Sequence, residues 1–128
     1  MKLAEQEKLY WTKHSREKMQ YYRISQNRIK RVLRSPDRKE IGIAPKTIAL
    51  MQQSGTKRHP TEIWLMYQIE KIHPVKPSAN GGRAARRQMF NRVKIISAWR
   101  YPGISPKGKP PPIPEDIIFE LNEQGLTN

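Results

Sequence analysis

The apolar residues in the first third of the chain are spaced as in two short helices. Met19 and Tyr22 stand three positions apart, which predicts a helix over about residues 15–22. A second helix is predicted by apolar residues at i, i+3 and i+4, namely Ile29, Val32 and Leu33. Ser25 is a favourable N-cap for this helix, and Pro36 disfavours helical conformation at the residue before it, so the helix is predicted to end there.

After Pro36 the apolar residues alternate with polar ones, which is typical of β-strands. Four segments show strand-like patterns: residues 38–44, 47–51, 62–69 and 93–99. Two helices followed by strands predict an α+β domain. We expect two N-terminal helices that pack across one face of a roughly four-stranded, mostly antiparallel sheet.

The last two of these segments are apolar on both faces, as strands at the centre of a sheet are. One places Ile63, Leu65, Tyr67 and Ile69 on one face, and Trp64 and Met66 on the other. The other is predicted to place Val93, Ile95 and Trp99 opposite Ile96 and Ala98. We therefore expect both tryptophans to lie in the core.

The predicted domain spans residues 10–101, and the segments outside its elements differ from it in composition. Residues 1–9 are charged and predict a helical or frayed lead-in. Residues 72–91 form a basic insert that is longer than a hairpin needs, so it is either a functional loop or a disordered one. Residues 102–128 form a tail that is proline-rich at its start. The tail is predicted to close with a short acidic helix whose apolar side is Ile117, Ile118 and Leu121.

The chain is strongly basic, with 25 Lys and Arg against 11 Asp and Glu and a formal net charge of +14. Between Lys71 and Pro114 there are ten Lys or Arg residues and no Asp or Glu. Folding does not require such a segment to exclude negative charge. A surface that contacts phosphates does require the absence of negative charge, because each carboxylate would repel the phosphates. The pattern favours a nucleic acid as partner, above all RNA or the ribosome.

Several other classes of function are disfavoured by what the sequence lacks. Zero cysteines exclude disulfides and thiolate zinc sites. His14, His59 and His73 are scattered and lack a ligand motif, so no metal is expected, and no phosphate-binding loop suggests a nucleotide or other small-molecule cofactor. No apolar stretch resembles a secretion signal or a membrane span. We expect a soluble, cytoplasmic protein without a membrane or cofactor partner.

Three short strings resemble a small bacterial domain family of unknown function that is related to the RelE/ParE/BrnT toxins. They are YWTKHSREKMQYYRIS at residues 10–25, IKRVLRSPD at 29–37 and KIISAWRY at 94–101. The resemblance implies a compact α+β fold that begins with a strand ending in His, and cleavage of messenger RNA on the ribosome. The chain departs from the family pattern, which usually has Arg, Arg and Gly, at Lys18, Tyr22 and Arg23.

A ribonuclease of this kind works without a metal, because cations stabilise the charge that develops on the phosphate. The residues that would form such a site are His14, Arg23, Arg100 and Tyr101. By resemblance His14 matches the family's histidine before the first helix. A structural role, capping that helix or bonding a strand carbonyl, is the alternative for His14, and a solvated strand end is the alternative for Arg100 and Tyr101.

A second set of basic residues is predicted to contact RNA phosphates. It comprises Lys30, Arg31 and Arg34 on the second helix, Arg83, Arg86 and Arg87 in the insert, and Arg92 and Lys94 at the start of the last strand. A solvated helix face or loop is the alternative. Three functions therefore stay open: a metal-independent endoribonuclease toxin, a non-catalytic RNA- or ribosome-binding protein, and a basic module that holds an acidic antitoxin-like protein.

Overall fold

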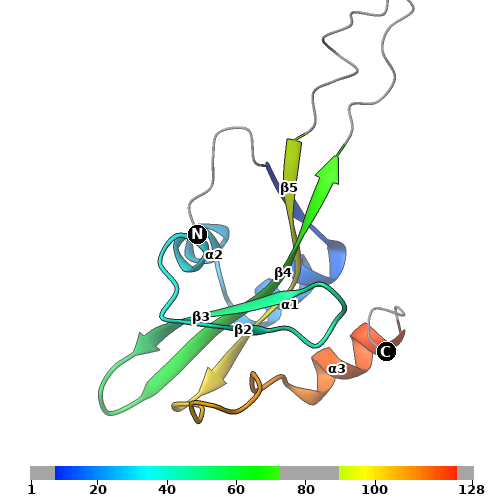
Figure 1. Ribbon diagram of the computed structural model, residues 1–128. Helices are drawn as coiled ribbons and strands as arrows, with labels where there is room; N and C mark the ends of the chain where they lie inside the picture. The colour runs from blue at the N-terminus through cyan, green and yellow to red at the C-terminus, as the bar shows by residue number, and fades with distance from the viewer. Residues whose placement is uncertain (1–7, 73–89, 124–128) are drawn as a thin grey trace, which may run out of the picture.

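The computed structural model describes residues 8–72 and 90–123, which place five strands in one sheet with helices on both faces (Figure 1). The elements are β1 (Lys8–Trp11), α1 (Lys13–Tyr22), α2 (Gln26–Arg34), β2 (Arg38–Ile41), β3 (Ile48–Gly55), β4 (Pro60–Ile72), β5 (Phe90–Pro102) and α3 (Glu115–Glu123). The strand order is β1-β5-β4-β3-β2, with β1 parallel to β5 and the other neighbours antiparallel. The predicted α+β class, with two N-terminal helices and a mostly antiparallel sheet, is confirmed, although the sheet has five strands where about four were predicted.

The additional strand is β1, which begins inside the predicted lead-in. Lys8 pairs with Arg92 and Trp11 with Ile95, so residues 8–11 form an edge strand, whereas residues 1–7 of the predicted lead-in lie outside the described residues. Four residues are too few to give a clear alternation, and the pairing joins distant parts of the chain. The strand ends at Trp11, so His14 lies in the first turn of α1 and not at the end of the strand that the resemblance implies.

Side-chain caps set the boundaries of the two N-terminal helices. Thr12 is the N-cap of α1 and accepts a hydrogen bond from the backbone N–H of Ser15 at 3.1 Å. Ser25 caps α2 in the same way and accepts from the N–H of Arg28 at 3.0 Å, as predicted. Between the helices Arg23 takes the left-handed conformation (φ 57°) that ends α1. Within the described residues no helix, α3 included, is long and apolar enough to cross a membrane.

The predicted faces of the last strand are wrong beyond its middle. The register of β4 and β5 shifts between Met66 and Tyr67, where a β-bulge gives β5 one extra residue. One extra residue reverses the alternation of side chains from that point on. Trp99 therefore lies on the same face as Ile96, and Ala98 lies on the face of Val93 and Ile95, where Trp99 was predicted. There Trp99 stacks on Trp64, with 6.0 Å between ring centroids and 3° between the ring planes.

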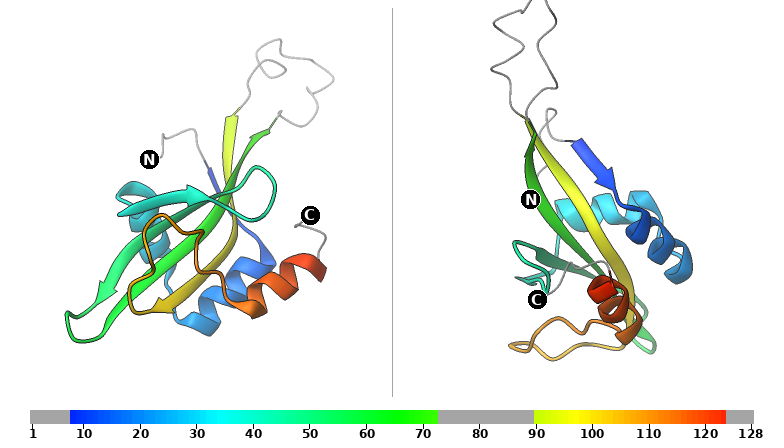
Figure 2. Two further views of the ribbon diagram at one scale, coloured as in Figure 1. Left: turned by 60° about the horizontal axis from the view of Figure 1, so that its bottom comes forward. Right: turned by 90° about the vertical axis from the view of Figure 1, so that its right-hand side faces the viewer.

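Two hydrophobic cores lie on opposite faces of the sheet (Figure 2). The core under α1 and α2 includes Ile29, Leu33, Leu50, Leu65 and Ile95. The core under α3 includes Trp64, Met66, Trp99, Ile117 and Leu121. Burial of one such side chain contributes about 1.5–3 kcal/mol. Because α3 buries both Ile117 and Leu121, this helix at the end of the predicted tail belongs to the folded domain. Ile118, predicted on the apolar side of that helix, is 37 % exposed.

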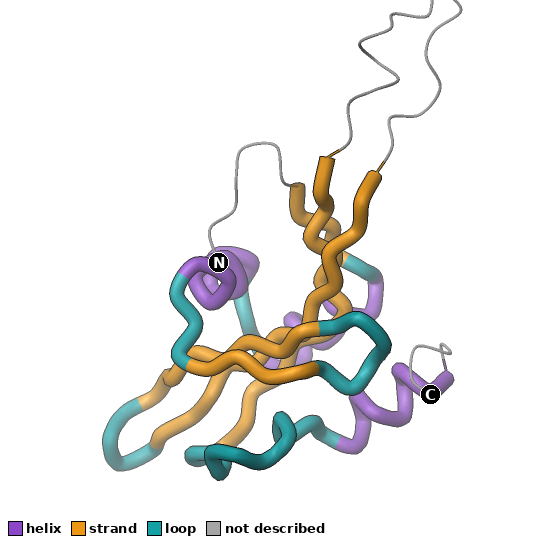
Figure 3. Tube along the Cα trace, in the orientation of Figure 1, coloured by secondary structure: helices purple, strands orange, loops and turns teal. Residues whose placement is uncertain are grey.

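The segment between β5 and α3 runs along the α3 side of the sheet and is hydrogen-bonded to it (Figure 3). The backbone N–H of Ser105 donates to a carboxylate oxygen of Glu62 at 3.0 Å. Arg38 of β2 donates to the carbonyl oxygen of Lys109 at 2.8 Å. The proline-rich start of the predicted tail therefore forms one wall of a surface on this side of the sheet.

Candidate nucleic-acid interface

Two of the residues predicted for a catalytic site, Arg23 and Arg100, meet at the C-terminal end of α1. Arg100 projects from β5 on the α1 and α2 side of the sheet, beside Ile63. Its Nε donates to the carbonyl oxygen of Tyr22 at 3.4 Å, and its Nη2 to that of Arg23 at 3.3 Å. Carbonyl oxygens at a helix C-terminus carry partial negative charge, which these contacts neutralise only in part. Arg100 is thereby fixed at the turn between α1 and α2.

Arg28 of α2 brings further positive charge to the same place. Its Nη2 donates to the carbonyl oxygen of Gln53 at 3.0 Å, and its Nε is buried without a hydrogen-bond partner among the described residues. Burial lowers the pKa of Arg28, and the charges of Arg31 and Arg100 lower it further against a smaller opposite effect of Asp37. The guanidinium nevertheless stays protonated. Arg28, Arg31 and Arg100 therefore form an arginine cluster.

An arginine cluster of this kind is suited to anions. Each guanidinium presents several N–H donors in a planar fork that matches a phosphate, and arginine also stacks on bases. Like charges that are held together repel one another, and a bound phosphate removes that repulsion. The cluster draws on α2 and β5, so it exists only in the folded chain.

His14 does not join the arginine cluster. It is 4 % exposed, with Nε2 2.9 Å from Ser97 Oγ and Nδ1 3.0 Å from a carboxylate oxygen of Glu120. Burial lowers the pKa of His14 more than the charge of Glu120 raises it, so the ring is neutral, with Nδ1–H donating to Glu120 and Nε2 accepting from Ser97. At a rise of about 1.5 Å per residue, His14 and Arg23 are roughly 13 Å apart along α1. One phosphate cannot contact both side chains in the manner expected for a ribonuclease site.

The contacts of His14 also differ from both structural roles considered for it. Thr12 is the cap of α1, and the partner on β5 is the hydroxyl of Ser97, not a strand carbonyl. A serine, a histidine and a glutamate that are linked by hydrogen bonds in this order resemble a hydrolytic triad. Ser97, however, has no exposed surface, and Glu120 belongs to α3, so moving that helix to admit a substrate would also remove Glu120. The three residues form a structural network.

That network continues along the contact between α1 and α3. Lys18 Nζ lies 2.6 Å from Asp116 and 2.7 Å from Glu120, and the hydroxyl of Tyr22 donates to Asp116 at 3.2 Å. We call these contacts, together with those of His14, the α1–α3 seam. Burial would lower the pKa of Lys18, but its hydrogen bonds to the two carboxylates raise it. Two of the departures from the family pattern, Lys18 and Tyr22, are thus the residues that hold the acidic terminal helix.

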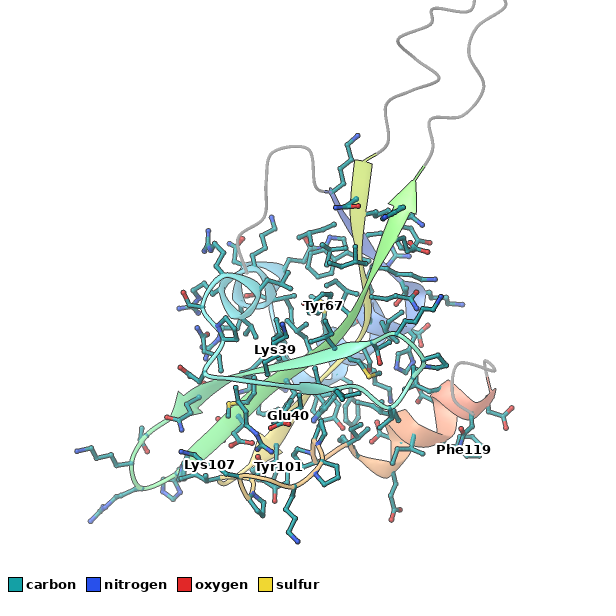
Figure 4. The ribbon with its side chains drawn as sticks, in the orientation of Figure 1. Lys39, Glu40, Tyr67, Tyr101, Lys107 and Phe119 are labelled. Carbon is teal, nitrogen blue, oxygen red and sulfur yellow. The ribbon has the colours of Figure 1, made fainter. Side chains whose placement is uncertain are left out.

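Tyr101, the fourth residue predicted for a catalytic site, lies on the other face of the sheet from Arg100. It is half-buried and packs against the core that contains Trp64 and Trp99. Neighbouring residues in a strand point to opposite faces, so Arg100 and Tyr101 do not act together. Figure 4 shows Tyr101 at the end of the sheet near the segment that follows β5.

Among the described residues predicted to bind RNA phosphates, Arg92 and Lys94 lie away from the arginine cluster, beside Glu70 of β4. Arg92 donates twice to Glu70, at 2.9 and 2.7 Å, and its guanidinium lies 4.3 Å from the ring centroid of Tyr10. Lys94 is 3.9 Å from the same carboxylate group. On α2, Arg31 joins the cluster, whereas Lys30 is half-buried and Arg34 is exposed in the last turn. Arg83, Arg86 and Arg87 lie outside the described residues.

Sequence reasoning did not single out Arg28 or the neighbouring Asp37 and Gln53. The i, i+3 spacing of Arg28 and Arg31 was a usable signal for a basic helix face. The position of Arg100 beside that face follows from the sheet topology and has no local signal. Within residues 8–72 and 90–123, no group of three or more His, Asp or Glu side chains is arranged to hold a metal ion. The chain matches no protein-family model, no curated protein and no solved structure.

Proposed function

We propose that the protein binds RNA through the arginine cluster and does not cleave it. The observation that carries the proposal is that Arg28 and Arg100, from two distant parts of the chain, are each held by backbone carbonyls and lie close enough for the charge of Arg100 to lower the pKa of Arg28. Arg28 also keeps a buried Nε without a partner among the described residues, and a phosphate oxygen would reach this donor once the side chain turns outward. A buried unpaired donor costs about 1–3 kcal/mol, and a phosphate oxygen would recover part of that free energy.

The choice of RNA rests on the resemblance to the RelE-like toxins and on the chemistry of arginine. Guanidinium groups bind phosphates bidentately and stack on unpaired bases, which RNA loops and single strands expose. The net charge of +14 favours association with any polyanion and makes binding dependent on salt. DNA of the same sequence is therefore the proper competitor in a binding experiment.

Endoribonuclease activity of the RelE kind is the second candidate. It is favoured by the contact of Arg100 with the carbonyl of Arg23 at the end of the last strand, where the resemblance implies site residues. It also needs a general acid or base, and the predicted one, His14, is buried in the α1–α3 seam. The acidic antitoxin-like partner is a third candidate, which would occupy the same cluster through carboxylates.

Binding of a fluorescently labelled RNA, followed by anisotropy over a range of salt concentrations, tests the proposal. We expect Arg28→Ala and Arg100→Ala each to weaken binding by about tenfold at low salt, since a charge-assisted hydrogen bond contributes roughly 1.5–3 kcal/mol. Each should also reduce the slope of log K against log salt by about 1. Arg16→Ala, which removes an exposed arginine near the other end of α1, is the matched control.

The same samples, run on a denaturing gel, separate binding from cleavage. Intact RNA with the wild type, and unchanged affinity of His14→Gln, would agree with a binding protein. Cleavage that is lost in Arg100→Ala would replace the proposal with the toxin. Equal affinity and equal salt slope for Arg28→Ala, Arg100→Ala and Arg16→Ala would reject the arginine cluster as the binding site.

A further inference from the structure

We infer that a pocket on the α3 side of the sheet, next to the free edge of β3 that Arg28 reaches from the other side, binds an unpaired base through an edge that carries an amino group. This inference rests on the proposed RNA binding and adds the chemical class of the base. The pocket has a volume of about 330 Å³ and lies between β2, β3 and the segment that follows β5. Its walls include Arg38, Glu40, Met51, Gln53, Glu62 and Ile104. We call it the Arg38 pocket.

The back wall of the Arg38 pocket is held in place by hydrogen bonds. Glu62 is 1 % exposed and accepts from Trp64 Nε1 at 2.9 Å and from Ser105 Oγ at 2.6 Å. Arg38 donates to Ser105 Oγ at 2.7 Å and to Glu40 at 2.5 Å, and lies over the Trp64 ring. Polar groups whose positions are fixed before a ligand arrives lose little conformational entropy on binding. The pocket is therefore preorganised.

The lining of the pocket offers acceptors, because three carboxylates stand against two cations, Arg38 and Lys107, and Arg38 is already paired. The donors of Arg38 are engaged by Glu40, Ser105 and the Lys109 carbonyl, as described above. Asp37 and Glu40 add carboxylates to the lining, and Figure 4 shows Glu40 on the side of β2 that faces the segment after β5. Carboxylates accept hydrogen bonds from exocyclic amino groups of bases. The guanidinium of Arg38 among these carboxylates makes the site unsuitable for a metal cation.

Apolar side chains supply a surface for a flat ring. Ile104 is 64 % exposed although it is large and apolar, and it lines the Arg38 pocket together with the buried Met51. An exposed isoleucine next to a pocket gains free energy when a ring covers it, at about 25 cal/mol per Å² of apolar surface. The volume of the pocket is at the lower end of the range for small-molecule sites, which is about 300–1,000 Å³.

Gln53 joins the Arg38 pocket to the arginine cluster. Its carbonyl oxygen accepts from Arg28 Nη2 at 3.0 Å, and its N–H donates to Asp37 Oδ2 at 2.8 Å. Both contacts lie at the edge of β3 beyond the end of β2, where Arg38 pairs with Met51. One residue therefore separates a phosphate-binding arginine from a carboxylate at the pocket. Arg28 and Asp37 thus bond to the same residue at this free edge, so a nucleotide that passes around the edge from Arg28 would bring its base to Asp37.

A second pocket extends the site along the β3–β4 hairpin. Its volume is about 400 Å³, and it shares Gln53 and Ile104 with the Arg38 pocket. Thr61 Oγ1 in its wall is buried and has no hydrogen-bond partner among the described residues. Buried polar atoms without partners are rare in folded proteins, and a ribose hydroxyl or a base would satisfy this one. The two pockets together fit a strand that continues past the first base.

Labelled homopolymers of about ten nucleotides test the inference, a length within the usual site size of single-strand binding folds. We expect the wild type to bind oligo(C) and oligo(A) about tenfold more tightly than oligo(U), since uracil has no amino group and a specific base contact discriminates by roughly 1–3 kcal/mol. In Asp37→Asn and Glu40→Gln the ratio should fall toward one, with the salt slope unchanged. Ile104→Ala, at an exposed position, should weaken binding of all three without changing their ratio.

The outcomes separate this inference from the proposed function. Equal affinity for the three homopolymers, with a slope that Arg28→Ala reduces, would overturn the base pocket and leave RNA binding intact. Absence of binding to every homopolymer would overturn both. A preference for oligo(C) and oligo(A) that survives both Asp37→Asn and Glu40→Gln would place base recognition elsewhere and also overturn the inference. Thermal unfolding of each variant shows that the comparison is made on folded protein.

Discussion

Lys18 in the first helix places its ammonium group 2.6 Å from the carboxylate of Asp116 in the last helix. The contact spans almost the whole described chain and attaches α3 to α1. Its surroundings are polar on both sides, with Tyr22 bonded to the same carboxylate and Glu120 bonded to the same ammonium group. The α1–α3 seam therefore closes the fold, and its end at Tyr22 is one hydrogen bond away from Arg100 of the arginine cluster.

Replacement of Lys18 should destabilise the protein through the two carboxylates that it leaves behind. The side chain of Lys18 is 9 % exposed, whereas those of Asp116 and Glu120 are 41 % and 36 % exposed. Removing the partner of a buried charge lowers the free energy of unfolding more than removing an exposed ion pair does. Because Asp116 and Glu120 are partly exposed, we expect Lys18→Met to lower it by about 1–2 kcal/mol. Urea unfolding of Lys18→Met measures it. Lys13→Met, at an exposed position of the same helix, should change the free energy of unfolding by less than about 0.5 kcal/mol.

The fold was predictable from sequence wherever the pattern was local. The helical stripe of Ile29, Val32 and Leu33 and the cap at Ser25 predicted α2 correctly. The position of Trp99 was wrong because a β-bulge depends on how β5 pairs with β4, which no periodicity within β5 reveals. The strand at Lys8–Trp11 was implied by the resemblance but not by the apolar pattern, because its stability comes from parallel pairing with a segment more than eighty residues away.

The site was less predictable than the fold, because it depends on contacts between elements. Arg23 and Arg100 were singled out, and they are in contact. The contact, however, is made by the backbone carbonyl of Arg23, and it lies at the opposite end of α1 from His14. Arg28 was not singled out, since nothing in its neighbourhood along the chain shows that β5 brings another arginine to it. The acidic residues of α3, Asp116 and Glu120, have no sequence signal that assigns them to Lys18.

Alkaline pH should weaken the α1–α3 seam through Tyr22. Burial, together with the charge of Asp116 and the hydrogen bond to it, raises the pKa of Tyr22 from 10.0 to about 12. A raised pKa means that the folded state holds the proton more tightly than the unfolded one. The contribution of the protonated Tyr22 hydroxyl to the free energy of unfolding is therefore present below pH 10 and is lost as the pH rises from 10 toward 12.

Urea unfolding at a series of pH values up to about 11 measures this loss, with Tyr22→Phe as the comparison. The phenylalanine variant should start less stable at neutral pH and show a smaller decline, because it has no proton to lose. The pKa of Lys18 is also raised above 10.5, so part of the decline will remain in Tyr22→Phe. Parallel curves for the two proteins would show that Tyr22 does not titrate in this range.

Mildly acidic pH should weaken the same seam through His14. Burial lowers the pKa of His14 below 6.5, so the folded state disfavours the proton that the unfolded state accepts. The stability that comes from the neutral ring is present above pH 6.5 and is lost as the pH falls through the lowered value. Lys18 opposes protonation of the ring, whereas Glu120 and Glu17 favour it.

His14→Gln separates this effect from the titration of carboxylates. The amide can keep hydrogen bonds to Ser97 and Glu120 but does not titrate, so its stability should stay level between pH 7 and about 5 while that of the wild type falls. Below this range both proteins should lose stability together, because the hydrogen bond to Lys18 lowers the pKa of Asp116 below 3.8 although burial acts in the opposite direction. A wild-type curve as level as that of the variant would contradict the neutral, buried histidine.

The arginines of the basic insert provide an independent test of how far the RNA contact extends. Arg83, Arg86 and Arg87 lie outside the described residues, and their role stays a prediction from the absence of acidic residues around them. If they contact phosphates, the triple alanine variant should lower the salt slope by about 2–3 units, roughly one for each contact. Lys13→Ala and Arg16→Ala together, at exposed positions of α1, are the control for loss of positive charge. A slope reduced equally by the control and the triple variant would mean that the insert contributes only general charge. A loss confined to the triple variant would mean that RNA contacts both the insert and the arginine cluster.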